Sequence, residues 1–137
     1  MRAVLNSMSA ACLVLTAAML PQDAAAMIQC GTASWYGLEA GTRRADGGSV
    51  DASALTAAHR SLPFGTKVKV ENLDNGRVAT VEINDRGPFT HARVIDVSKG
   101  VAAQLDFVGD GVARVRITTL QGIEEEKEIA ASAKKCP

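Results

Sequence analysis

Residues 67–83 read KVKVENLDNGRVATVEI and carry the clearest structural signal in this sequence. Residues 67–71 and 78–83 both alternate between apolar and polar side chains, which is the period of a strand with one buried face. Between them stands Asn75-Gly76, a dipeptide typical of hairpin turns because both residue types tolerate a positive φ. We therefore predict a β-hairpin over this stretch.

Further short strands are predicted on both sides of the hairpin. They cover residues 33–36, 55–58, 93–97 and 112–120. Amphipathic helix patterns are nearly absent. One short helix is expected after Ser98, a favourable N-cap residue, with Val101, Ala102 and Leu105 as its apolar stripe. About six strands, glycine-bearing loops and one small helix predict an all-β fold in the form of a small closed barrel.

The first 26 residues are expected to be a signal peptide. A basic start at Arg2 precedes an uncharged apolar run at 10–20, and residues 24–26 supply an A-x-A cleavage site. The alternative is a membrane anchor, but this run is shorter than the roughly 20 residues that a bilayer core takes. The remaining residues, 27–137, suit one domain. We expect them to form a soluble periplasmic protein that is not inserted into a membrane.

Three cysteines bear on the compartment and the fold. Cys12 lies in the predicted signal peptide without the apolar residue that lipidation requires three positions earlier, so no lipid anchor is expected. Cys30 and Cys136 remain, and an oxidising compartment favours their pairing. Such a disulfide would close most of the chain into one loop and stabilise it by on the order of 4–5 kcal/mol. The alternative is that both thiols are unpaired.

The charge balance limits the partners of the protein. Fifteen basic residues match fifteen acidic ones, so no strongly basic surface for nucleic acid or anionic membrane is expected. The two histidines and the cysteines lack metal-ligand spacing, and we predict no metal and no other cofactor. The protein is expected to be a monomer.

Two carboxylates stand where strands meet loops. Asp85 follows the second hairpin strand, two residues before the turn at Gly87-Pro88. Asp96 lies between apolar residues of the strand 93–97, so it is expected to be partly enclosed and to need partners. Structural alternatives exist for both: Asp85 can cap the turn, and Asp96 can satisfy backbone donors before the helix.

At these residues the sequence resembles the rare lipoprotein A family. The shared motifs, in the same order and spacing, are GTASWYG at 31–37, LTAAHRSLPFGT at 55–66, NDRGPF at 84–89 and RVIDVS at 93–98. The resemblance covers residues 31–120 and implies a six-stranded double-psi β-barrel with an open groove, as in expansins. It also implies an enzyme that cleaves peptidoglycan glycan strands between N-acetylmuramic acid and N-acetylglucosamine without water, leaving a 1,6-anhydro end.

The resemblance implies roles for individual residues. Asp85 would be the catalytic acid and base, with His59 and Asp96 as further catalytic residues. Taken alone, a histidine at a strand end is more often structural than catalytic. Trp35 and Tyr36 would offer a platform for a sugar ring, but neighbouring residues of a strand face opposite sides, so at most one of them contributes.

One departure from the family pattern concerns the loop before residue 50. Gly48 stands where family members usually carry a glutamate. Asp46 or Asp51 would replace it in substrate binding if the loop were rearranged, and Glu39 is a weaker candidate. Arg86 is expected to face sugar hydroxyls or a loop carbonyl.

The implied chemistry makes a modest demand on the protein. One carboxylic acid protonates the leaving glycosidic oxygen and then takes the proton of the sugar's own C6 hydroxyl as that oxygen attacks. Because the nucleophile belongs to the substrate, one acid suffices where hydrolases need two carboxylates. A lytic transglycosylase is therefore the first hypothesis. Its rivals are an expansin-like glycan-binding barrel without turnover and a structural protein of the cell envelope.

Overall fold

The computed structural model describes residues 27–37, 43–90, 92–120 and 136–137. The predicted signal peptide and Glu39 lie outside the described residues. Within the described part, no helix has the length and apolar character needed to cross a membrane.

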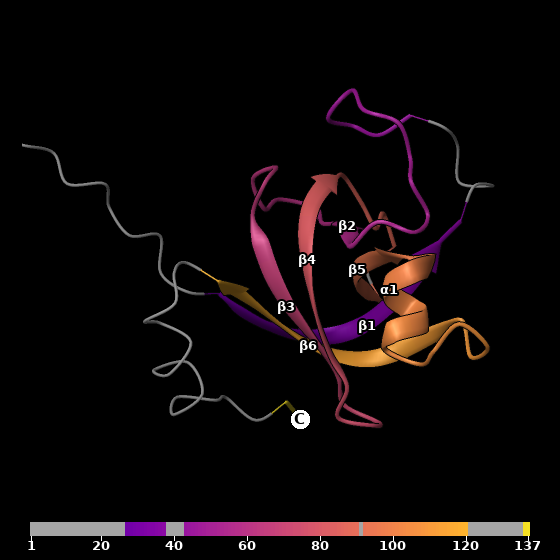
Figure 1. Ribbon diagram of the computed structural model, residues 1–137. Coiled ribbons are helices and arrows are strands. Elements are labelled where there is room, and N and C mark those ends of the chain that lie inside the picture. Colours follow the sequence, from indigo (N-terminus) through magenta and orange to yellow (C-terminus); the bar gives the residue numbers. More distant parts are fainter. Residues whose placement is uncertain (1–26, 38–42, 91, 121–135) are drawn as a thin grey trace, which may run out of the picture.

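Six strands and one helix make up the described fold. They are β1 (Ile28–Tyr36), β2 (Thr56–Ala58), β3 (Lys67–Asn72), β4 (Val78–Asp85), β5 (Arg93–Ser98), α1 (Lys99–Gln104) and β6 (Val112–Leu120). The strands form a closed barrel in the order β1-β5-β2-β4-β3-β6, and β6 closes on β1 (Figure 1). The β1–β5 and β2–β4 pairs are parallel, and the other four are antiparallel. The predicted all-β fold with one short helix is confirmed.

The predicted hairpin is present as β3 and β4. Its alternation buries Val68 and Val70 on β3, while Lys67 is exposed. Gly76 in the connecting turn has a φ of 76°, in the left-handed region where glycine is favoured. In Figure 1 this turn lies at the lower end of the barrel, and β4 ends at the upper end. The hairpin therefore fixes where Asp85, the last residue of β4, is presented.

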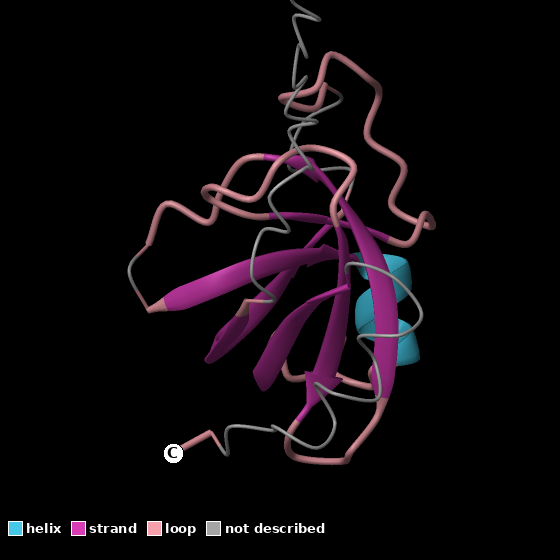
Figure 2. Ribbon diagram, turned by 90° about the vertical axis from the view of Figure 1, so that its left-hand side faces the viewer, coloured by secondary structure: helices cyan, strands magenta, loops and turns pink. Residues whose placement is uncertain are grey.

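The core draws on every strand and on α1. Its largest fully buried apolar side chains are Val68, Val70, Val81, Ile83, Pro88, Ile95, Val97, Val101, Leu105, Phe107, Val115 and Ile117. The predicted N-cap is confirmed, because the Ser98 hydroxyl oxygen accepts the N–H of Val101 at 3.3 Å. Figure 2 shows α1 lying on the outer side of the strands.

Strand β1 starts earlier than the alternation predicted. It begins at Ile28 rather than Ala33, because residues 28–34 pair with residues 112–118 of β6. This pairing brings the first strand beside the last one. The predicted disulfide is present between Cys30 and Cys136, whose Cα atoms lie 5.7 Å apart.

Candidate functional site

The two candidate carboxylates lie on either side of β2. Ala58 of β2 pairs with Asp85 on β4 and with Asp96 on β5. Neighbouring strands lie about 4.8 Å apart, so the backbones of the two acids are separated by roughly 10 Å. The barrel thus brings together two acids that the sequence separates by a turn and most of a strand.

The Asp85 carboxyl is held through one of its two oxygens. Oδ1 accepts the backbone N–H of Ala45 and that of Arg86, each at 2.8 Å. Oδ2 accepts no hydrogen bond from the described residues, and it is not among their fully buried unpaired atoms, so it keeps some exposure. The capping role that was the structural alternative is therefore present, but it occupies Oδ1 alone.

The loop that carries Ala45 is a compact turn closed by an ion pair. The Arg44 guanidinium donates to both carboxylate oxygens of Asp46, at 2.9 and 3.1 Å, and Asp46 also accepts the N–H of Gly48 at 2.9 Å. Arg44 first, and then this N–H group, hold the pKa of Asp46 below its ordinary value. Through Ala45 the same turn is bonded to Asp85.

Arg44 occupies the space beside Gly48. A β-carbon built on Gly48 would lie 2.0 Å from Nη2 of Arg44. A cation therefore fills the place where the resemblance puts a glutamate side chain. The hydrogen bond to Asp46 mainly raises the pKa of Arg44, and the charges of Tyr36 and Asp85 add to this.

Asp51, the other acid predicted to replace the glutamate, has local partners. Its Oδ1 accepts the N–H of Ser53 at 2.9 Å and the hydroxyl of Ser53 at 2.6 Å. These bonds hold the pKa of Asp51 below its ordinary value. Asp46 and Asp51 thus both stabilise turns of their own loop. Within the described residues, no three His, Cys, Asp or Glu side chains gather into a group able to hold a metal ion.

Tyr36 lies close to both acids. Its hydroxyl is hydrogen-bonded to Oγ1 of Thr56 at 3.0 Å. Burial raises the pKa of Tyr36, and the negative charges of Asp85 and Asp96 raise it further. Of the two aromatic residues expected near the sugar, this is the one that the fold brings to the carboxylates.

Trp35 has its contacts elsewhere. Its indole Nε1 donates to the backbone oxygen of Val108 at 3.2 Å, and the ammonium of Lys99 lies 5.7 Å from the ring centre. The ring also packs against the hydrophobic core. These contacts place Trp35 with α1 and the loop that follows it.

Asp96 is partly enclosed, as predicted, and side chains satisfy one of its two oxygens. Its Oδ1 accepts the hydroxyl of Ser34 and forms an ion pair with Nε of Arg93 at 3.7 Å. Nη1 of Arg93 also donates to the Ser34 hydroxyl oxygen, at 2.7 Å. The partners are therefore neighbours on β1 and β5, and not the backbone donors at the start of α1.

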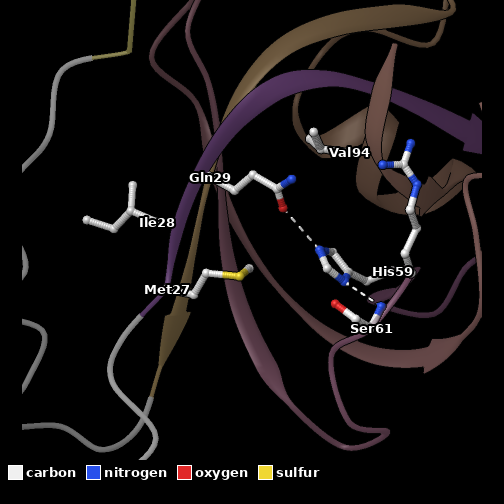
Figure 3. A pocket seen from close by; sticks show the side chains of 7 residues that line it. Met27, Ile28, Gln29, His59, Ser61 and Val94 are labelled. Carbon is white, nitrogen blue, oxygen red and sulfur yellow. Dashed lines mark hydrogen bonds between the residues drawn. The ribbon is translucent and has the colours of Figure 1, made fainter. Parts of the chain in front are cut away.

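His59 is buried and bonded through both ring nitrogens (Figure 3). Its Nδ1 accepts the N–H of Ser61 and that of Leu62, each at 3.1 Å. A nitrogen that accepts two bonds carries no proton, so the proton lies on Nε2. Nε2 then donates to Oε1 of Gln29 at 3.2 Å. The neutral ring braces the chain that follows β2.

The surroundings of His59 keep it neutral. Burial lowers its pKa, and the positive charges of Arg60 and Arg86 lower it further. The ring lines a cavity of about 360 Å³ together with Met27, Ile28, Gln29, Arg60, Ser61 and Val94. Figure 3 shows Gln29 and Ser61 turned toward the ring inside this cavity.

Two arginines hold the loops around the acids. Arg86 donates to the backbone oxygens of His59 and Leu62, at 3.3 and 2.8 Å, and its guanidinium lies 4.0 Å from the centre of the Phe64 ring. Of the two expectations for Arg86, the loop carbonyls are therefore what it contacts. Arg60 was not singled out from the sequence, yet it donates to backbone oxygens of the turn after β4. The only sign of Arg60 in the sequence was its place directly after His59 in the shared motif at 55–66.

Comparison with known proteins gives consistent relatives. Residues 28–117 match the family described as Lytic transglycolase. The "Probable endolytic peptidoglycan transglycosylase RlpA" of Nostoc sp. is 53% identical over 109 residues, which are 75% of this chain and 29% of that protein. "Endolytic peptidoglycan transglycosylase RlpA" is 48% identical in Campylobacter jejuni (66% of this chain, 33% of the relative) and 44% in Pseudomonas aeruginosa (74% and 30%). The chain thus spans about a third of the length of these relatives.

Two solved structures share the fold. Streptomyces papain inhibitor superposes with a TM-score of 0.57 at 23% identity, covering 69% of this chain and 96% of its own. An expansin of Clavibacter michiganensis in complex with cellohexaose gives 0.56 at 20% identity, covering 69% and 51%. Both agree with the predicted double-psi β-barrel. Since the matched family covers well over half of the sequence, this chain belongs to the lytic transglycolase family, as an RlpA-like member.

Proposed function

We propose that this chain is an endolytic peptidoglycan transglycosylase whose acid and base is Asp85. The observation that carries the proposal is the asymmetry of its carboxyl group. Two backbone N–H groups fix Oδ1, while Oδ2 is unbonded and not fully buried at the end of β4. A carboxyl that is fixed through one oxygen can present the other to a substrate with little loss of conformational freedom.

The proposed reaction uses that single oxygen twice. The proton of Oδ2 passes to the glycosidic oxygen as the bond from this oxygen to C1 of N-acetylmuramic acid breaks. The C6 hydroxyl oxygen of the same sugar then bonds to C1, and its proton returns to Oδ2 of Asp85. The products are a chain with a 1,6-anhydro end and a chain with a free 4-hydroxyl, and no water or cofactor is consumed.

The surrounding groups would bind and position the glycan. Tyr36 and Asp96 both lie near the proposed acid, and each offers a polar group to sugar hydroxyls. His59 is a positioning residue in this scheme, since its bonds brace the loop to which Arg86 also donates. Arg86 in turn supplies one of the two N–H groups on Asp85.

We further propose that the protein acts as a soluble monomer in the periplasm after removal of residues 1–26. The disulfide between Cys30 and Cys136 supports export, since such bonds form and persist in oxidising compartments. Peptidoglycan strands would be its partner.

The test is the digestion of purified peptidoglycan sacculi, with released products identified by mass spectrometry. The wild type should release fragments with 1,6-anhydro ends. Asp85→Asn should lower this release by about a hundredfold or more, because an amide cannot act as the acid. Its melting temperature should stay unchanged, because the amide oxygen still accepts both N–H groups. Asp74→Asn, in the turn at the other end of β4, is the matched control and should behave as the wild type.

A second candidate is a barrel that binds glycan without cleaving it. The guanidinium of Arg44 beside Gly48, where the resemblance puts a glutamate, favours this candidate. Wild-type protein that sediments with sacculi but releases no anhydro product would support the binder. Protein that neither sediments nor releases product would point to a structural role in the envelope.

A further inference from the structure

Phe89 is unusually exposed for a large apolar residue. Its relative exposure is 85%, whereas the other exposed large apolar residues of the described chain lie between 42% and 51%. These are Leu55, Phe64, Val78 and Val112. Single apolar side chains on a surface are common, so exposure alone assigns no role. The neighbours of Phe89 indicate whether its ring has a role in binding.

Gly87 links the Phe89 ring to the acidic site. A β-carbon built on Gly87 would lie 3.6 Å from Cε2 of Phe89 and 3.9 Å from Oδ2 of Asp96. The ring and the carboxylate therefore lie beside the same glycine. Gly87 also has a φ of 125°, which a side chain would disfavour, so the space between them stays open.

The backbone on both sides of Phe89 is anchored. Arg60 donates to the backbone oxygen of Pro88 at 2.7 Å, to that of Thr90, and to that of Arg93 at 2.6 Å. One guanidinium thus ties the turn to the start of β5. An exposed ring on an anchored backbone can bind a ligand with little ordering cost.

The other aromatic rings that are not fully buried are engaged in contacts of their own. Phe64 has one face against the guanidinium of Arg86, and Trp35 packs on the core with its N–H bonded to a backbone oxygen. The hydroxyl of Tyr36 is bonded to Thr56. Phe89 has the ring that is most available to solvent.

We infer that Phe89 is a stacking platform for one sugar ring of the glycan strand, on the Asp96 side of the site. This inference rests on the proposed function. The C–H face of a pyranose packs on an aromatic ring, while its hydroxyls at the edge reach Oδ2 of Asp96. Asp85 lies across β2 from Asp96, and the Phe89 ring lies beside Asp96, so one glycan strand would contact all three. The platform would hold the strand while the neighbouring bond is cleaved.

The test compares Phe89→Leu and Phe89→Tyr with the wild type in sedimentation with purified sacculi at increasing sacculus concentration. Val78→Ala, at the other end of β4, is the control. Loss of the ring in Phe89→Leu should weaken binding about three- to tenfold. Phe89→Tyr and Val78→Ala should bind within about twofold of the wild type. All melting temperatures should agree, because the ring is largely exposed.

Product release should change in the same sense. Since stacking acts on the bound strand before and during cleavage, Phe89→Leu should raise KM and leave kcat nearly unchanged. If the wild type and Phe89→Leu sediment with sacculi equally well, Phe89 is not a stacking platform, and the proposed function is unaffected. Equal weakening in Phe89→Tyr and Phe89→Leu would also overturn it, because the aromatic ring would then be irrelevant. A wild type that does not sediment with sacculi would overturn both.

Discussion

Replacing His59 by asparagine and by glutamine separates a structural histidine from a catalytic one. The amide of asparagine reaches the position of Nδ1, and that of glutamine reaches the position of Nε2. His59→Asn therefore keeps an acceptor for the N–H groups of Ser61 and Leu62 and gives up the bond to Gln29. His59→Gln keeps that bond and leaves the two N–H groups without their acceptor.

The size of each effect follows from the bonds lost. One hydrogen bond contributes about 1 kcal/mol net, so His59→Asn should cost about 1 kcal/mol. Two lost bonds to partly buried N–H groups should make His59→Gln cost about 2–3 kcal/mol. Urea unfolding followed by circular dichroism resolves this difference. Equal stability of the two variants would refute the assignment of the proton to Nε2.

The same pair tests the role of His59 in turnover. If the ring only positions the loop, His59→Asn should retain most of the release of anhydro products. A stable His59→Asn protein as inactive as Asp85→Asn would show that the ring takes part in the chemistry. ¹⁵N NMR of labelled histidine supplies an independent readout, because it reports which ring nitrogen carries the proton.

The pH dependence of stability follows from the same ring. The folded state lowers the pKa of His59 below 6.5, so the unfolded chain binds a proton more readily. This contribution to stability is complete above about pH 6.5 and is lost as the pH falls toward the folded-state pKa. His59→Asn should lack this part of the acid sensitivity. Melting temperatures at pH 7.5 and pH 5.5 measure it, and an equal loss in wild type and variant would contradict it.

Two further predictions concern the scaffold. Replacing Cys30 and Cys136 by serine should destabilise the protein by about 4–5 kcal/mol, because the bridge spans 106 residues, and the melting temperature should fall by roughly 20 °C; a shift of only a few degrees would mean that the unfolded chain gains little freedom. Gly100→Ala should cost about 1–3 kcal/mol, because a β-carbon there would lie 2.8 Å from a backbone oxygen of the loop before β2. Gly109→Ala, where nothing lies within 4 Å, is the control, and equal melting temperatures for the two alanine variants would contradict the close contact.

Alternation along the chain was enough to predict β3, β4 and β6, because one face of each of these strands packs on the core. It did not predict the length of β1, which depends on pairing with β6 at the other end of the chain. The same period of two correctly separated Trp35 from Tyr36. It is a local property of a strand, so the sequence could show it.

Contacts across the barrel were out of reach of such reasoning. The tautomer of His59 depends on Gln29 of β1, and the anchoring role of Arg60 depends on carbonyls about 30 residues away. The exposure of Phe89 could not be predicted either, since a phenylalanine after a Gly-Pro turn can equally well be buried. The position of the Arg44 guanidinium beside Gly48 depends on how a short loop folds back on itself, which the sequence does not show.

The loop around Gly48 is where the chemistry of this protein departs from the pattern that its sequence resembles. The same turn that lacks the glutamate supplies an N–H group to Asp85 through Ala45, and it places the guanidinium of Arg44 beside Gly48. A second carboxylate is required where water must be activated, but in the proposed reaction the attacking hydroxyl belongs to the sugar. The turn therefore keeps a bond that fixes the proposed acid, while the cation beside Gly48 is the feature that favours the glycan-binding barrel, and digestion of sacculi by the wild type decides between the two.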